Sequence, residues 1–209
     1  MHKWSAQFAV FLTIAISTGC GSAGAGGPTG GAQPIPQSRP VYDADVNFFS
    51  GMIPHHAQAV KIARWAVTHG ANDAIKRMSE RIIVAQTDEI GLMQGWLRDR
   101  GKPVPAADAT HMTHMQGGVE HKMLMPGMLT DEELATLDKA RGVEFDRLFL
   151  TYMIKHHNGA VSMVDELFKQ YGGGQDETVF KMASDIYADQ TTEVGRMQVM
   201  LDALPGRTP

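Results

Sequence analysis

Cysteine is nearly absent from this sequence, which has one, Cys20, among 209 residues. A lone cysteine cannot close an intramolecular disulfide or supply a four-cysteine zinc site, so packing has to hold the fold together. The sequence also has no His-Glu-x-x-His motif and no EF-hand loop. The usual frameworks for zinc and calcium are therefore excluded.

An excess of positive charge is missing as well. The formal net charge is −4, and acidic and basic residues are interspersed along the chain. Nothing in this pattern builds the basic face that phosphate binding needs, so we expect no nucleic-acid partner. Hydrophobic residues make up 43% and charged residues 20%, which is typical of a globular domain.

The longest apolar run lies at the N-terminus, at residues 8–16, and it is too short to cross a bilayer. Lys3 precedes it and small residues follow it, which is the layout of a signal peptide. We predict a lipoprotein-type signal peptide over residues 1–20, with Cys20 lipidated, although Ser17 stands where that pattern usually has Leu. The alternative is simple cleavage after Cys20. Residues 21–41 are rich in Gly and Pro and predict a disordered tether.

The remaining sequence, 42–204, contains one pattern twice. Met-Ile-x-His-His occurs at 52–56 and 153–157, and Gln-x-x-Glu-x-x-x-Met follows at 86–93 and 190–197. Apolar spacing of three and four predicts long helices at 43–69, 73–100, 142–171 and 176–204. Each repeat, about 43–100 and 142–204, is then a helical hairpin. Two such hairpins bury their apolar stripes by packing into an all-α four-helix bundle.

Local signals agree with these bounds. Asn72 and Asp176 suit helix N-caps, and Gly70 and Gly172 suit C-caps. Pro54 should kink the first helix. Residues 101–141 form a linker between the repeats, in which Thr130 and Glu133 predict a capping box that opens a short helix.

The repeated motifs place candidate metal ligands in the buried seams. Met52 and His56 share a helix face at i, i+4, and Met153 and His157 repeat the pair. A buried carboxylate is costly unless a cation, a donor or a metal compensates it. The seam candidates are Asp45, Met52, His55, His56, Glu89, Met93, Asp146, Met153, His156, His157, Glu193 and Met197. The alternative is a His–Glu hydrogen-bond network that only fixes the bundle register.

The linker is a second candidate. The sequence has 14 Met and 9 His, and many of them gather here. Thioether and imidazole together select soft ions, Cu(I) above all. The linker candidates are His111, Met112, His114, Met115, His121, Met123, Met125 and Met128. We expect Met125 and Met128, which flank a Pro-Gly turn, to lie outside the helical core. The alternative is a flexible loop that is merely rich in Met.

These motifs resemble the bacterial family known as domain of unknown function 305. The likeness covers 42–204 and includes Met125-Pro-Gly-Met128. It implies a ferritin-like four-helix bundle, usually exported, with some members binding periplasmic copper through Met and His. The matching positions here are Met52, His55, His56, Gln86, Glu89 and Met93, and Met153, His156, His157, Gln190, Glu193 and Met197. The di-iron pattern of Glu-x-x-His is replaced by Gln-x-x-Glu and His-His, which counts against oxidase chemistry.

The sequence therefore predicts an exported protein that binds and sequesters copper, with Cu(I) preferred. Its expected partners are the metal ion, a membrane through lipidated Cys20, and copper-handling proteins of the cell envelope. Two other classes stay open: a metalloenzyme that uses the seam carboxylates and histidines, and a metal-free envelope protein that works through an interaction surface. Binding is favoured over catalysis.

Overall fold

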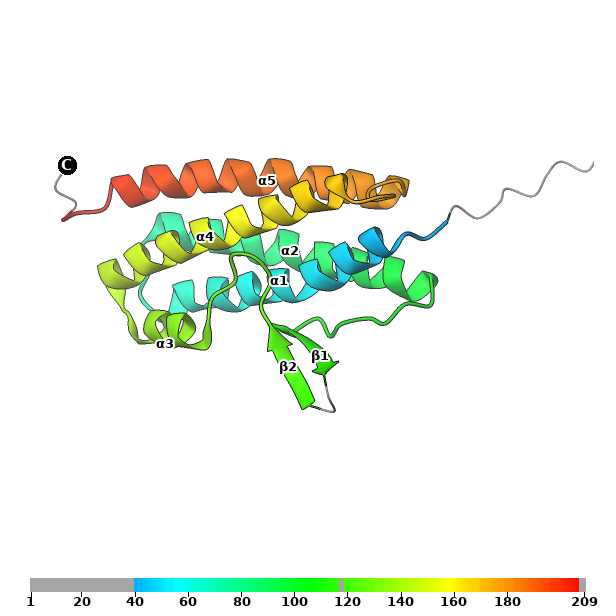
Figure 1. Cartoon of the computed structure of the whole chain (residues 1–209). Coiled ribbons are helices and arrows are strands. Elements are labelled where there is room, and N and C mark those ends of the chain that lie inside the picture. Colours follow the sequence, from blue (N-terminus) through cyan, green and yellow to red (C-terminus); the bar gives the residue numbers. More distant parts are fainter. Residues whose placement is uncertain (1–39, 117–118, 207–209) are drawn as a thin grey trace, which may run out of the picture. The chain divides into compact units, whose positions relative to one another are not determined.

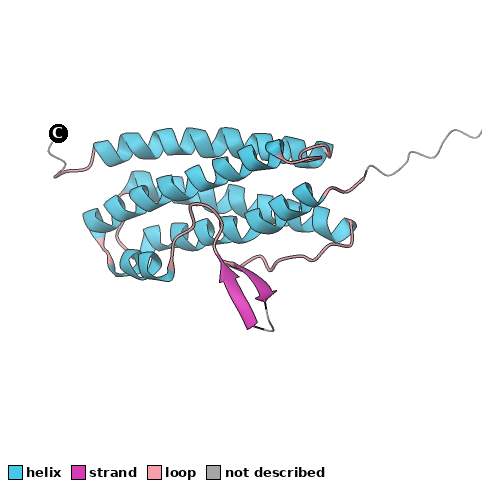
Figure 2. Cartoon of the chain, viewed as in Figure 1, coloured by secondary structure: helices cyan, strands magenta, loops and turns pink. Residues whose placement is uncertain are grey.

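A computed structural model describes residues 40–116 and 119–206 of the chain. The predicted signal peptide, with Cys20, and nearly all of the predicted tether lie outside these residues. The described residues are mainly helical, with one short β-hairpin (Figure 2). Among them, no helix is both long enough and apolar enough to span a membrane.

Four long helices make up most of the domain. They are α1 (Asp43–Thr68), α2 (Asp73–Asp99), α4 (Gly142–Lys169) and α5 (Glu177–Asp202), and α3 (Asp131–Lys139) is short. The predicted bounds of the long helices are confirmed to within two residues. Helices α1 and α2 form one hairpin and α4 and α5 another, and the hairpins meet through α1 and α4 (Figure 1).

The caps explain why the helices begin where they do. At the start of α2, the Asn72 side chain accepts hydrogen bonds from the amides of Ala74 and Ile75. At the start of α5, the Asp176 side chain accepts from the amides of Thr178 and Val179. Gly70 follows the C-cap of α1 with φ 74°, a conformation that favours glycine. The predicted C-cap at Gly172 is wrong, because α4 ends at Lys169 and its C-cap is Gln170.

The linker is more ordered than a flexible loop. Strand β1 (Met112–Gln116) pairs antiparallel with β2 (Val119–Met123), and their register sets His114 opposite His121. Figure 2 shows this hairpin extending away from the helices. This hairpin was not predicted from the sequence. The predicted capping box is confirmed: the Thr130 amide donates to Glu133 at 2.9 Å, and the Glu133 amide donates to the Thr130 hydroxyl at 3.2 Å.

The hydrophobic core is divided into two clusters. The first takes residues from 59–66 of α1, 75–82 of α2, 145–153 of α4 and 197–201 of α5. The second takes residues from 44–57, 90–97, 160–167 and 179–186 of the same helices. On each helix the change from one cluster to the other falls at the repeated motif. A polar layer therefore crosses the middle of the domain.

Candidate metal centre

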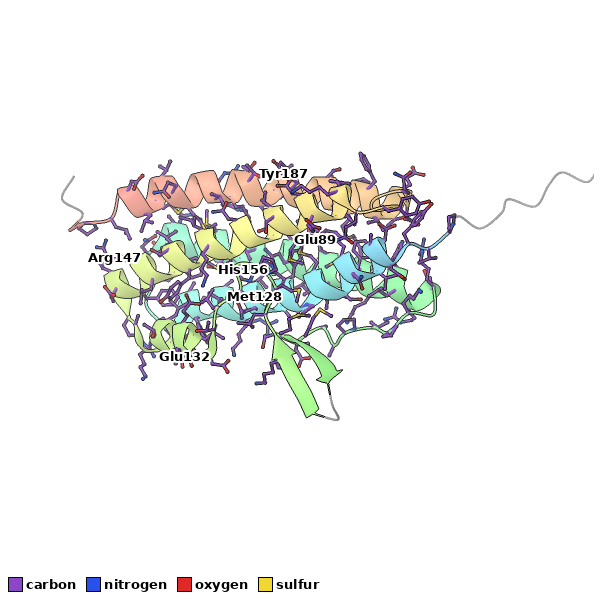
Figure 3. The ribbon with its side chains drawn as sticks, in the orientation of Figure 1. Glu89, Met128, Glu132, Arg147, His156 and Tyr187 are labelled. Atoms are coloured by element: carbon purple, nitrogen blue, oxygen red, sulfur yellow. The ribbon has the colours of Figure 1, made fainter. Side chains whose placement is uncertain are left out.

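Six fully buried side chains form this layer, which we call the polar layer. Its members are His55, His56, Gln86, His156, His157 and Gln190. The four histidines have no exposed surface, and the two glutamines are 2% and 3% exposed. Figure 3 labels His156, which lies midway along α4. Polar groups buried this deeply have to find partners inside the protein or in a ligand.

Two of the four histidine rings are hydrogen-bonded through Nε2, and the Nε2 of a third lies close to a carboxylate. His55 Nε2 donates to the Pro126 carbonyl at 3.0 Å, and His157 Nε2 donates to Glu193 Oε2 at 2.8 Å. His56 Nε2 lies at the same 2.8 Å from Glu89 Oε2, but at an angle outside hydrogen-bond geometry. Because the facing atoms are oxygens, Nε2 of these rings carries a proton, and Nδ1 is the ring nitrogen that remains for another partner.

The opposite ring nitrogens have no partner. Nδ1 is buried without a hydrogen bond in all four histidines of the layer, and so is Nε2 in His56 and His156. Both amide atoms of Gln86 and the Oε1 of Gln190 are also buried and unpaired. Each such atom costs about 1–3 kcal/mol when nothing satisfies it. Hydrogen bonds between the protein groups of the layer therefore leave several of its buried polar atoms without a partner.

Two rings of the layer, one from α1 and one from α4, lie in close, tilted contact. The centroids of His55 and His156 are 3.8 Å apart, with an interplanar angle of 40°. Burial, with the neighbouring His56 adding to the effect, lowers the pKa of His55 to about 3. Burial also lowers the pKa of His156 well below its ordinary value, with His55 adding to the effect. Both rings are neutral at neutral pH, which is the form of imidazole that binds metals.

Thioethers flank the layer on both sides. Met52 and Met93 belong to one core cluster, and Met153 and Met197 belong to the other. All four are fully buried. Met52 precedes His56 by one helical turn and Met153 precedes His157 likewise, so sulfur and imidazole occupy one helix face. The predicted seam residues of both repeats thus meet in the middle of the domain.

Asp45 and Asp146 do not join them. Along the axis of α1, Asp45 lies about 16 Å before His56, at 1.5 Å per residue. Its Oδ1 accepts from the Gly174 amide at 2.7 Å, and Asp146 accepts from the Asn72 amide and side chain at 3.2 and 2.8 Å. Each aspartate thus accepts hydrogen bonds from the turn of the opposite hairpin.

The linker candidates are divided between surface and core. Met123 is 42% exposed, and His111, Met112 and Met125 are half-buried. Met128 is buried, and its Sδ accepts from the Met125 amide at 3.2 Å, so the expectation that it lies outside the core is wrong. The side chains of His114, Met115 and His121 lie outside the described part of the structure.

The Pro126–Gly127 turn packs backbone to backbone on α4. A Cβ added to Gly159 would overlap the Pro126 carbonyl oxygen, and one added to Gly127 would lie 2.6 Å from the Lys155 oxygen. Met125 reaches α1 beside the turn: a Cβ added to Gly51 would be 3.0 Å from its Sδ. Tight packing of this turn explains why Met128 is buried.

A hollow of about 240 Å³ opens between α2 and α5 on the Glu89 and Glu193 side of the layer. Its lining includes Gln86, Gln190, both glutamates and Asp189. Burial raises the pKa of Asp189, and the charges of Glu89 and Glu193 raise it further, so the three carboxylates face one another. A larger hollow of about 650 Å³ lies on the far side of Glu89, but no polar-layer residue lines it.

Among the described residues, no three His, Cys, Asp or Glu side chains converge as a preformed metal site. Thioethers or amides would therefore have to complete a ligand set built on the histidines. The donors present, neutral imidazole beside buried thioether, fit a soft or borderline ion better than a hard one.

Comparison with known proteins identifies the family in which these motifs occur. The model of the family described as a domain of unknown function, DUF305, matches residues 45–201. The chain belongs to the DUF305 family. A solved DUF305 protein of Streptomyces coelicolor, described as secreted, is 25% identical, with a TM-score of 0.64, over 79% of this chain and 96% of that one.

A second solved relative carries a metal. CopM in its Cu(I)-bound form is 28% identical, with a TM-score of 0.58, over 78% of this chain and 98% of that one. CopM has also been solved in Cu(II)-bound and Ag-bound forms. A curated relative, the uncharacterized protein L153 of Acanthamoeba polyphaga mimivirus, is 36% identical over 56 residues. That match covers 27% of this chain and 37% of the relative's length.

Asp189 is the site residue that sequence reasoning missed. It precedes Gln190, whose counterpart in the first repeat is Gln86, so Asp189 aligns with Ala85. Because alanine has no polar side chain, the duplication does not single out Asp189 as a site residue. Glu193 follows it by one turn on α5, and the packing of α5 beside α2 brings it close to Glu89.

Proposed function

We propose that this chain binds copper at the polar layer, with Cu(I) preferred, and sequesters it outside the cytoplasm. The observation that carries the proposal is the set of four buried histidines whose Nδ1 atoms have no partner. Neutral imidazole nitrogen is a common metal ligand, and a buried lone pair is stabilised when it gains a cation.

The contacts of the other ring nitrogen support this assignment. Metal-binding histidines usually donate their second N–H to a carboxylate or a carbonyl, which fixes the tautomer and the ring orientation. Pro126 and Glu193 hold His55 and His157 in this way, and Glu89 faces His56. We assign Glu89 and Glu193 as positioning residues for the rings, and Asp45 and Asp146 as structural residues.

The thioethers favour copper among the possible ions. Met52, Met93, Met153 and Met197 flank the layer without exposed surface. Thioether is a soft ligand that suits Cu(I), whereas Zn²⁺ sites in proteins rest on thiolate, imidazole and carboxylate. The likeness to CopM, which has been solved with Cu(I), Cu(II) and Ag, agrees with this preference.

Replacing His56 and His157 together with Gln tests the site. Gln keeps a donor toward each glutamate but removes the imidazole nitrogen. Anaerobic Cu(I) titration against a chromophoric chelator should show the loss of the polar-layer copper, while circular dichroism shows that the helices persist. His69→Gln is the matched control, because His69 is a buried histidine that bonds Thr68 and Asp138 away from the layer. Unchanged stoichiometry in the double variant would rule out the polar layer as the site.

We propose further that the chain is exported and tethered through lipidated Cys20, with residues 21–41 as the spacer. The layout of the N-terminus supports this, and the Streptomyces relative is described as secreted. Cys20→Ser should move the protein from the membrane fraction to the soluble fraction without changing its thermal unfolding. A variant that stays in the membrane fraction would show that Cys20 is not the anchor.

The fold itself we interpret as a ferritin-like four-helix bundle that arose by duplication of one hairpin. The contacts that repeat across the two copies support this. His56–Glu89 and His157–Glu193 have the same 2.8 Å separation, and Asp45 and Asp146 each hold the turn of the other hairpin. Superposing residues 43–100 on 142–204 in an experimental structure should bring the two His-His pairs together.

A further inference from the structure

We propose that the hollow between α2 and α5 is the port through which the cation reaches the polar layer, and that Asp189 attracts it there. This inference rests on the proposed function and concerns the route rather than the binding site. The hollow is lined by three carboxylates and, behind them, by two glutamine amides. Oxygen donors of this kind hold a hydrated cation loosely before imidazole and thioether replace them.

The floor of the hollow leads to the histidines. Gln86 and Gln190 line it although they are 2% and 3% exposed, and three of their four amide atoms have no hydrogen bond. Glu89 and Glu193 also line it, and each is 18% exposed while its Oε2 lies 2.8 Å from a polar-layer ring. A cation in the hollow is therefore separated from His56 and His157 by a single carboxylate on each side.

The α1–α4 side of the layer is closed. The Pro126 carbonyl accepts from His55 Nε2, and the same residue packs against Gly159 so tightly that a Cβ there would overlap it. A Cβ on Gly127 would lie 3.0 Å from the His156 carbonyl. Entry on this side requires the turn to detach, whereas entry between α2 and α5 requires only side-chain movement.

The charge of the hollow favours a cation at one end. Asp189 is exposed, and it faces Glu89 and Glu193 closely enough for their charges to repel. Arg81 and Arg196 line the same hollow. Arg81 and Glu89 are about 12 Å apart along the axis of α2, at 1.5 Å per residue. Arg81 therefore lies at the end of the hollow that is far from the carboxylates. Arg196 lies one turn from Glu193 and opposes the carboxylates directly.

The rate of copper uptake tests the port. Stopped-flow quenching of tryptophan fluorescence should follow the binding of Cu²⁺ in a non-coordinating buffer at low ionic strength. Asp189→Asn should lower the second-order rate constant roughly three- to tenfold, as expected from lost electrostatic steering. Arg196→Gln should raise it. Both differences should shrink at high salt, because ions screen exposed charges.

The control is Asp165→Asn, which removes the same charge from an exposed position on α4 outside this hollow. It should bind at the parent rate, and all variants should keep the parent copper stoichiometry. If Asp189→Asn and Asp165→Asn take up copper at the same rate with normal stoichiometry, the port is overturned while the copper site stands. If the parent protein takes up no copper, the proposed function and the port fall together.

Discussion

Asp45 and Asp146 begin the seams of α1 and α4 at equivalent positions, but their hydrogen bonds differ. Asp146 uses both oxygens to accept from Asn72. Asp45 uses Oδ1 for the Gly174 amide, and its Oδ2 is buried without a hydrogen bond. Burial raises the pKa of Asp45. The negative charge is therefore compensated at Asp146 and poorly compensated at Asp45.

Exchanging each aspartate for Asn should separate the two roles. Asp146→Asn removes one acceptor and turns an amide N–H toward a donor, so we expect a loss of about 1–3 kcal/mol in the free energy of unfolding. Asp45→Asn keeps the acceptor for Gly174 and removes the buried charge, so stability should be unchanged or higher. Urea denaturation at neutral pH measures both. Equal destabilisation by the two changes would contradict this account.

Residue identities at the site could be read from the sequence because the motif is duplicated, but residue roles could not. His55 and His156 are in contact only because α1 and α4 pack together at the motif, which is a tertiary contact. Glu89 and Glu193 were candidates as ligands, but each instead lies beside the Nε2 of a histidine on the other helix of its own hairpin, which is again a tertiary contact. Asp189 gave no signal because Ala85 occupies the equivalent position in the first repeat.

Among the connecting elements, the Met125–Met128 turn has the strongest effect on the layer, because it both covers α4 and bonds His55. Gly159→Ala would place a methyl group against the Pro126 carbonyl oxygen. We expect a loss of roughly 1–3 kcal/mol, the usual cost of overpacking. Thermal and urea unfolding measure this effect.

Gly195→Ala is the matched control for this change. Gly195 lies inside α5, and a Cβ there would meet nothing within 4 Å. Alanine should therefore raise stability by roughly 0.5–1 kcal/mol through helix propensity alone. If Gly159→Ala stabilises the protein by the same amount, the turn does not pack on α4 in solution.

The linker methionines form a second element whose role can be separated from that of the layer. Replacing Met112, Met115, Met123, Met125 and Met128 with Leu keeps apolar bulk and removes sulfur. We expect this variant to lose part of its Cu(I) stoichiometry while keeping helical content and most Cu(II) binding, because the layer supplies nitrogen donors. Met78 and Met182, which are buried in the two core clusters, provide a control pair for replacement with Leu. If the variant with all five replacements binds as much Cu(I) as the parent, the linker methionines are not copper ligands and the linker serves only as a spacer.

Elements with a local cause were predictable and elements with a tertiary cause were not. Helix bounds follow from apolar periodicity and from capping by Asn72, Asp176 and Thr130, all of which act within a few residues. The β-hairpin lacks an alternating apolar pattern, so periodicity did not indicate it. The Gly-Gly pair at 117–118 of the sequence, a typical two-residue turn signal, could have indicated it and was overlooked. Met128 was assigned to a loop correctly, but its burial depends on the distant glycine of α4.

At the scale of the whole molecule, the polar layer divides the core, so its protonation affects the folding of both halves. The ordinary pKa of a histidine is 6.5, and burial lowers that of His55 to about 3 and that of His156 well below 6.5. Below pH 6.5 the unfolded chain therefore takes up protons at these residues that the native protein does not. By linkage, the free energy of unfolding falls as the pH falls through this range.

We therefore predict that the metal-free protein loses stability steadily from neutral pH down to about pH 4, by at most about 1.4 kcal/mol per pH unit for each such histidine. Replacing His55 and His156 with Gln removes both titrating groups, so the double variant should show a flatter profile over the same range. His111→Gln, at a half-buried position in the linker, leaves the layer intact and should keep the parent slope. Urea denaturation at successive pH values measures all three proteins. If the free energy of unfolding changes with pH to the same extent in the parent and the double variant, His55 and His156 are not buried as neutral rings in solution.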